Sequence, residues 1–198
     1  HETVSQYANG GTGDEGGIFT DLGTSAWAAE SIMRLYEQDV ISPAEDKRFR
    51  PEDQVTREEF VKLLTAAFGL SLSREGSGFV DAEAGAWYEP YLAAAKAAGI
   101  VEGKPDGSFG VGQPITRQDM SAMAYRAVNS LGKSLKQPQE AEGFVDEAEI
   151  DSYAREAVTA MQSAGVLNGM GDGSFRPLEE TSRAQAAKVI AGLLDAVE

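Results

Sequence analysis

The chain has 198 residues, a formal charge of −15, no cysteine and a single histidine, His1. The acidic balance argues against nucleic acid as a partner, because phosphate binding requires an excess of clustered Lys and Arg. The lack of cysteine excludes disulfides and thiolate metal sites. No apolar run reaches the about 20 residues that span a bilayer, so we expect no membrane insertion. Because the chain begins with His, we expect it to be a piece of a longer protein.

A sequence pattern recurs three times after an N-terminal extension of residues 1–18. Each copy opens with Phe-x-Asp, at Phe19, Phe79 and Phe144. We assign three repeats, 19–72, 73–136 and 137–198. Units of about 60 residues are individually too small for a secure core. We therefore predict one mainly α-helical body, in which three helix-loop-helix repeats share a central helical core with pseudo-threefold symmetry.

The first half of each repeat predicts a helix. These segments are rich in Ala and place apolar residues at helical spacing, at 27–38, 87–98 and 153–164. Gly99 and Gly165 follow the second and third segments, where a left-handed residue commonly ends a helix. Asp39 stands at the same place in the first repeat and is a poorer but tolerable substitute.

The connectors between the helices contain turn sequences. Residues 104–109 and 170–175 each include Asp-Gly-Ser-Phe, in which Asp-Gly supplies a sharp reversal of the chain. The first repeat has no glycine at this place, and we expect its loop to be shaped differently. Pro43 there occupies the position of Gly103 and Gly169.

The second helix of each repeat starts with a capping box. The capping hydroxyls are those of Thr56, Thr116 and Ser182, and the residues three positions later are Glu59, Asp119 and Gln185. In such a box the hydroxyl accepts a hydrogen bond from the later amide, and the later side chain reaches back to the cap. Each helix also has a broad apolar face, so we expect the three faces to meet in one core.

An arginine directly follows each cap, at Arg57, Arg117 and Arg183. A cation in the first helical turn opposes the helix dipole by about 0.3–1 kcal/mol, so three such arginines require a compensating anion. One alternative is an internal ion pair with the aspartates of the Phe-x-Asp motifs, Asp21, Asp81 and Asp146. The other is an external carboxylate or phosphate, held by the guanidinium and the helix N-terminus together. The sequence leaves both open.

Aromatic residues open the first helices, at Trp27, Trp87 and Tyr153. Repeated aromatic side chains are commonly core residues, and this interpretation is favoured for Phe19, Phe79 and Phe144. A Trp beside a cation and carboxylates can also hold a sugar ring against its apolar face. For the Trp and Tyr set the two interpretations stay open.

Signatures of enzymes are missing from the sequence. There is no cysteine nucleophile, no internal histidine, and no Gly-x-Ser-x-Gly, P-loop or HExxH motif. Carboxylate pairs such as Glu58 and Glu59 are explained by helix capping and solvated helix faces. We therefore predict a protein that is not an enzyme and needs no cofactor or metal.

The order of these motifs, Phe-x-Asp, Trp-Ala, a glycine-rich turn with Phe, then Thr-Arg-x-Glu, resembles the S-layer homology (SLH) domain. The resemblance covers nearly the whole chain from Phe19 onward, as a triplet. It implies a three-pronged helical pseudo-trimer, monomeric, secreted, and located at the cell surface in the S-layer or cell wall of Gram-positive bacteria. There it would anchor a surface protein without covalent bonds to secondary cell wall polymer, through pyruvylated N-acetylmannosamine units bound in grooves between repeats.

The resemblance also implies ligand-binding roles for particular residues. In the family the arginine of the Thr-Arg motif is a principal ligand contact, and this role carries over to Arg57, Arg117 and Arg183. A pyruvate ketal carries a carboxylate, which suits such an arginine. The remaining expected ligand contacts are Trp27, Trp87, Asp21, Asp81, Glu59, Asp119 and the backbones of Gly103 and Gly169.

The three copies depart from the family pattern in different ways. The third repeat has Gln185 in place of the carboxylate and Tyr153 in place of the tryptophan. We therefore predict unequal grooves, one of them closed or idle. A rival interpretation is an assembly module, in which the same grooves take a peptide carboxylate or an adjacent subunit.

Overall fold

The computed structural model describes residues 17–198. Residues 1–16 of the predicted N-terminal extension lie outside the described residues. The described residues form six α-helices and two short 3-10 helices. The α-helices are α1 (Ala26–Glu37), α2 (Arg57–Ala67), α3 (Glu89–Ala97), α4 (Arg117–Ser130), α5 (Ser152–Ser163) and α6 (Arg183–Ala196). The 3-10 helices are η1 (Leu22–Ser25) and η2 (Glu147–Glu149). The predicted mainly α fold is confirmed.

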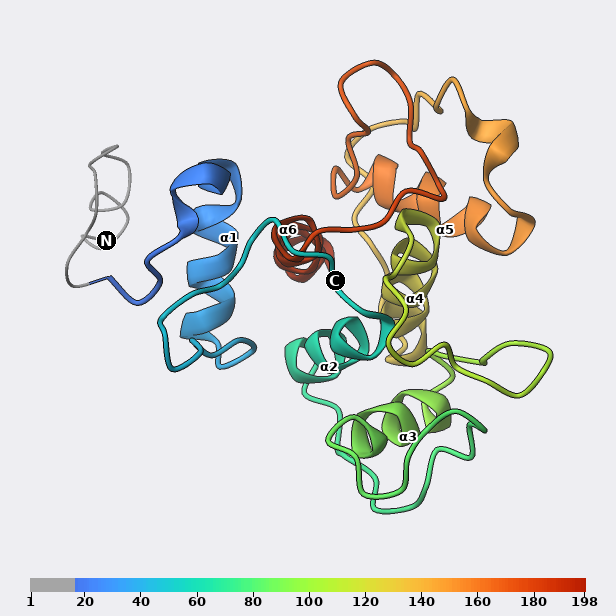
Figure 1. Ribbon diagram of the computed structural model, residues 1–198. Coiled ribbons are helices and arrows are strands. Elements are labelled where there is room, and N and C mark those ends of the chain that lie inside the picture. Colours follow the sequence, from blue (N-terminus) through green and yellow to red (C-terminus); the bar gives the residue numbers. More distant parts are fainter. Residues whose placement is uncertain (1–16) are drawn as a thin grey trace.

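The second helices α2, α4 and α6 gather at the centre, and α1, α3 and α5 lie outside them (Figure 1). All three central helices contact one another, and their inner side chains belong to one hydrophobic cluster. Phe60, Met120 and Ile190, one from each central helix, are fully buried. The predicted meeting of three apolar faces is therefore confirmed.

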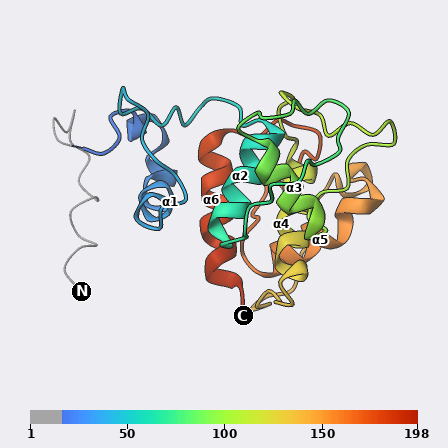
Figure 2. The same cartoon turned by 90° about the horizontal axis from the view of Figure 1, so that it is seen from below.

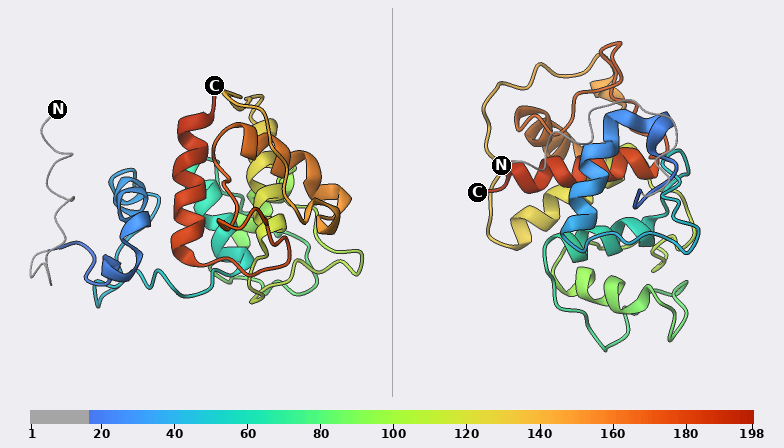
Figure 3. Two further views of the ribbon diagram at one scale, coloured as in Figure 1. Left: turned by 90° about the horizontal axis from the view of Figure 1, so that it is seen from above. Right: turned by 90° about the vertical axis from the view of Figure 1, so that its left-hand side faces the viewer.

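Each outer helix packs against the central helix of the preceding repeat. The pairs are α3 with α2, α5 with α4, and α1 with α6. The pair α1 and α6 joins the first and last helices of the described chain, and α1 lies to one side of the other helices, next to α6 (Figures 2 and 3). An ion pair between Arg34 and Asp195, 2.6 Å from Nη1 to Oδ1, reinforces it. Each helix pair therefore joins two different repeats: the first with the second, the second with the third, and the third with the first. We call this arrangement the cyclic packing.

A closed ring of backbone hydrogen bonds joins the three repeats just before the central helices. The amide of Val55 donates to Thr181, that of Thr181 to Ile115, and that of Ile115 to Val55, each over 3.0 Å. The ring brings the N-termini of α2, α4 and α6 to the same end of the molecule. The side chains in the first turns of these three helices therefore lie at one end of the molecule.

The capping boxes are confirmed at two of three helices. The hydroxyls of Thr56 and Ser182 accept amide hydrogen bonds of 3.3 and 3.2 Å, and the side chains of Glu59 and Gln185 reach back to the caps. At α4 the hydroxyl bond is present, at 3.3 Å. The return bond from Asp119 is missing, so the prediction is wrong for this half of the box, because the carboxylate is engaged elsewhere.

Two residues of the first repeat adopt the left-handed backbone conformation in which the other repeats have glycine. Asp39 ends α1 with φ of 58°, in the left-handed conformation that the sequence predicts. In the first connector Lys47 adopts φ of 55°, where the second repeat has Gly107. Its carbonyl accepts from Thr20 over 2.9 Å, as Gly107 accepts from Val80 over 3.1 Å. At Lys47 the turn therefore keeps the conformation of the glycine-containing connectors. The start of the loop differs as predicted, because Pro43 cannot adopt the positive φ of Gly103 and Gly169.

Among residues 17–198, no helix combines the length and the apolar character needed to cross a bilayer.

Candidate functional site

The three arginines occupy equivalent places at the helix N-termini. Arg57, Arg117 and Arg183 are the first residues of α2, α4 and α6. In each, Nε donates to a phenylalanine carbonyl of the next repeat around the ring, over 2.9, 2.7 and 2.9 Å. In each, the guanidinium carbon also lies 4.9 Å from the ring centroid of that phenylalanine. Nε is therefore used to join repeats, and the Nη atoms remain available to other partners.

The aspartates of the Phe-x-Asp motifs do not compensate these arginines. Asp21 accepts from the amides of Phe49 and Arg50, both at 2.8 Å. Asp81 accepts from three successive amides, at 2.7–2.9 Å. Asp146 accepts from two, at 2.8 and 2.7 Å. Among the described residues none of the three aspartates lies within ion-pair distance of these arginines, so this one of the two open alternatives does not hold.

The backbone hydrogen bonds lower the pKa of two of these aspartates, Asp81 and Asp146. Burial raises the pKa of Asp81, but the hydrogen bonds from the backbone of residues 109–111 outweigh it, and the pKa lies below its ordinary value. The same balance of burial against amide hydrogen bonds lowers the pKa of Asp146. These carboxylates fix the connector loops. A ligand contact by Asp21 or Asp81 stays a prediction.

The arginines instead face the third helical residue of a neighbouring central helix. Arg57 Nη1 lies 2.5 Å from Asp119 Oδ2, in a partly buried ion pair. Asp119 also accepts a hydrogen bond from the hydroxyl of Tyr153. Partial burial and this bond to the carboxylate raise the pKa of Tyr153 above its usual range. We name Arg57, Asp119 and Tyr153 the Arg57 site.

The Arg183 site is looser. Arg183 Nη1 lies 3.7 Å from Glu59 Oε2, and Glu59 is shared with the cap of its own helix, over 3.0 Å. The aromatic residue of this site is Trp87, which lies beside Lys62, one turn after Glu59. We define the Arg183 site by Arg183, Glu59 and Trp87.

The Arg117 site has no carboxylate at the corresponding place. Gln185 stands there, and its side chain accepts from the Ser182 amide over 3.1 Å. Among residues 17–198, no carboxylate lies within 4.0 Å of the Arg117 guanidinium, although this residue is only 6% exposed. Burial lowers its pKa. The Arg117 site consists of Arg117, Gln185 and Trp27, the aromatic residue at the equivalent position.

In the Arg57 site, hydrogen bonds join one residue from each repeat, Arg57, Asp119 and Tyr153. The reason is the cyclic packing of outer helices on central helices of the preceding repeat.

The aromatic residues at the sites are not part of the core. Trp27, Trp87 and Tyr153 are 52%, 52% and 50% exposed, so the core interpretation is wrong for this set. Phe19 and Phe79 are buried, as predicted, whereas Phe144 is only partly buried and packs against the core. The exposed rings present flat apolar faces beside charged groups, an arrangement that suits sugar rings.

Two lysines complete the sites and were missed by the sequence analysis. Lys62 Nζ lies 5.6 Å from the ring centroid of Trp87, and Lys188 Nζ lies 5.4 Å from that of Trp27. A signal was present, since each lysine follows the site arginine of its own helix by five residues. The second repeat has Ala122 at this position, so Tyr153 has no such cation beside it.

The glycines predicted to contact ligand have a structural role. Gly103 and Gly169 adopt φ of 83° and 72°, and a Cβ on either would lie within 2.8 Å of the Phe79 or Phe144 ring. These positions are therefore reserved for glycine by the phenylalanine that covers them. Ligand contact through their backbones stays a prediction.

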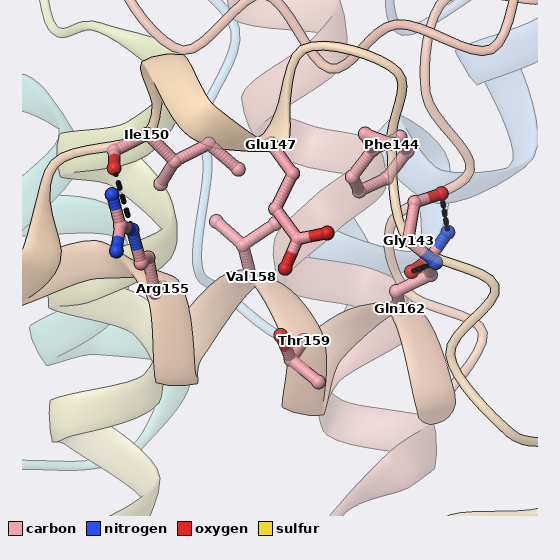
Figure 4. A pocket seen from close by; sticks show the side chains of 8 residues that line it. All are labelled: Gly143, Phe144, Glu147, Ile150, Arg155, Val158, Thr159 and Gln162. Carbon is pink, nitrogen blue, oxygen red and sulfur yellow. Dashed lines mark hydrogen bonds between the residues drawn. The ribbon is translucent and has the colours of Figure 1, made fainter.

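Two hollows lie away from the three sites as defined. One, between η2 and α5, holds only about 10 Å³ (Figure 4). Its walls are tied together by Arg155 Nε donating to the Ile150 carbonyl and by Gln162 bonded to Gly143. The other is an open depression of about 500 Å³ lined in part by Asp21, Arg48 and Arg50. The first is large enough for at most one water molecule.

Comparison with known proteins adds the family. The S-layer homology domain matches residues 18–61, 78–121 and 143–187, so the chain belongs to the SLH family. An endoglucanase of Bacillus sp. (strain KSM-635) is 38% identical over 89% of this chain and 18% of its own length. An amylopullulanase of Thermoanaerobacterium thermosulfurigenes is 32% identical, over 85% and 9%. The S-layer protein sap of Bacillus anthracis is 27% identical, over 89% and 21%.

The chain spans about a tenth to a fifth of the length of these relatives. The family and the S-layer relatives indicate a secreted surface protein that is associated with the cell wall. They support cell-wall anchoring in general.

Proposed function

We propose that this SLH triplet anchors its parent protein to secondary cell wall polymer by binding pyruvylated N-acetylmannosamine units at the arginine sites. The binding involves no chemistry, and the module acts as a monomer with three internal sites. The parent protein would be held at the wall by contacts that form and break without covalent bonds.

The observation that carries the proposal is the repeated grouping of a helix N-terminal arginine with an exposed aromatic ring. Each guanidinium is held in place by its Nε hydrogen bond and its phenylalanine, so little side-chain entropy is lost when a ligand binds. A carboxylate matches a guanidinium in geometry and charge. A ketal carboxylate on a sugar would place the anion at the arginine and the ring against the aromatic face.

The net charge of −15 limits how such binding works. An anionic polymer is repelled at distances up to about a Debye length, roughly 8–10 Å near physiological salt. Recognition must therefore come from short-range contacts at the sites. Several weak sites on one polymer raise retention through effective concentration.

The test is calorimetric titration of the chain with a pyruvylated N-acetylmannosamine glycoside and with the same sugar lacking the ketal. We expect binding of the pyruvylated glycoside alone. Equal binding of both sugars would refute recognition through the carboxylate. No binding of either, together with self-association in analytical ultracentrifugation, would favour the assembly module instead.

A further inference from the structure

The three sites differ in which side chain of the protein, if any, pairs with the guanidinium of the arginine. The difference lies at the third residue of the neighbouring central helix, which is Asp119, Glu59 or Gln185. The aromatic position differs in the same direction, with tyrosine where the carboxylate is closest and tryptophan at the other two sites. Two independent positions therefore distinguish the sites.

The Arg57 site is filled by side chains of the protein itself. Asp119 has left the cap of its own helix, where its equivalents Glu59 and Gln185 remain. It accepts from Arg57 Nη1 through one oxygen and from the Tyr153 hydroxyl through the other. An incoming carboxylate would have to displace Asp119 from Arg57 and then lie beside it, and like charges at such a distance repel.

The Arg117 site presents the opposite situation. Arg117 as a residue is only 6% exposed, and the only hydrogen bond of its side chain among the described residues joins Nε to the Phe175 carbonyl. Glu179 and Asp146 act on it only at longer range. Buried charges in proteins are normally paired, so this cation lacks the partner that the other two arginines have.

The surroundings of Arg117 fit an external anion. It begins α4, a helix of 14 residues, whose dipole favours negative charge at this end. The first three amides of α4 already donate to the carbonyls of Glu179 and Pro177 and to the Thr116 hydroxyl. Among the described residues, the donors left for an anion are therefore the Nη groups of Arg117. Gln185 is held in its own cap and brings no charge. Lys188 adds a second cation beside Trp27, one turn further along α6. An anion could enter here without displacing any carboxylate of the protein.

We propose that the Arg117 site is the principal carboxylate-binding site, that the Arg183 site is secondary, and that Tyr153 and Asp119 close the Arg57 site. The residue at the third helical position and the aromatic residue opposite it thus determine which sites bind. This inference rests on the proposed function and deepens it, because it specifies where the ketal carboxylate is bound.

The first experiment repeats the calorimetric titration with the pyruvylated glycoside on Arg117→Ala. We expect the tightest binding to weaken about tenfold or more, as for loss of a charge-assisted pair. Arg126→Ala is the matched control, since it removes one positive charge from the same helix and its partner Glu102 is exposed. An equal loss in both variants would overturn the inference. Far-UV circular dichroism confirms that each variant is folded.

The second experiment exchanges the features of the two sites and keeps all three arginines. Gln185→Asp with Trp27→Tyr should close the Arg117 site and weaken the tightest binding. Asp119→Gln with Tyr153→Trp should open the Arg57 site and raise the number of glycosides bound by one. If the wild type binds but neither exchange changes affinity or number, the inference is wrong and the proposed function stands. If the wild type binds no glycoside, both fail.

Discussion

Replacing Arg57 and Arg117 by alanine should destabilise the protein to very different extents. Both changes remove a hydrogen bond from Nε to a buried carbonyl, of 2.9 and 2.7 Å, and a guanidinium stacked 4.9 Å from a ring. Only Arg57→Ala also breaks an ion pair, to Asp119. The comparison therefore isolates the ion pair, because the other losses are matched.

The magnitudes follow from the contacts. A hydrogen bond from a charged donor contributes about 1.5–3 kcal/mol, and a cation–π contact about 0.5–1 kcal/mol. For Arg57 these two losses sum to about 2–4 kcal/mol. The loss of the partly buried pair, which leaves Asp119 unpaired, adds about 1–3 kcal/mol, so we expect a total of about 4–6 kcal/mol. For Arg117 the removal of a buried unpaired cation offsets part of the loss, so we expect about 1–2 kcal/mol.

Urea unfolding at pH 7, followed by far-UV circular dichroism, measures both free energies of unfolding. Arg126→Ala serves as the surface reference and should stay within about 0.5 kcal/mol of the wild type. Equal destabilisation by Arg57→Ala and Arg117→Ala would refute the reasoning, since it would mean that Asp119 contributes nothing or that Arg117 has a hidden partner.

Three further outcomes are expected. Gly103→Ala should lower the free energy of unfolding by about 2–3 kcal/mol, because its Cβ would lie 2.5 Å from the Phe79 ring at a φ of 83°. The control Gly69→Ala has open space around its Cβ and should lower it by about 1 kcal/mol in the same urea assay. Absorbance titration should show a tyrosine step above the ordinary value of 10, because partial burial and the bond to Asp119 raise the pKa of Tyr153, and Tyr153→Phe should abolish this step. An unchanged curve would contradict the bond to Asp119. Asp81→Asn should lower stability by about 1–3 kcal/mol at pH 7. Because the folded pKa is depressed, this gap should be full above the ordinary value of 3.8 and shrink as the pH falls through the folded pKa; a gap that stays constant in melts down to pH 2 would count against it.

Local structure was the part of the fold that could be predicted from the sequence. Helix starts at Thr56, Thr116 and Ser182 depend on residues three positions apart, and helix ends such as Asp39 depend on one backbone conformation. Such signals involve residues within about one helical turn of each other, so they can be recognised in the sequence. The family resemblance added the overall architecture, which local signals do not contain.

The composition of the sites could be predicted only in part. The helix dipole indicates that the arginines need an anion, and among the described residues Arg57 and Arg183 face one, in Asp119 and Glu59. The aspartates considered as their partners accept backbone amides instead. The pairing of Arg57 with Asp119 joins residues 62 positions apart, through a cyclic packing that no local pattern encodes. The lysines beside the tryptophans follow from the same packing, because each lies on a helix of a different repeat from its aromatic partner.

The cyclic packing also bears on the order in which the molecule can form. The helix α1 has its partner α6 at the far end of the chain, with a hydrogen bond from Arg34 to a carbonyl 157 residues later. Loops of this length close late and slow the search for the native state. The first helix can dock only once the chain extends through α6. A partly made or truncated chain that lacks α6 leaves the apolar face of α1 uncovered, so the domain reaches its native state as a whole or not at all.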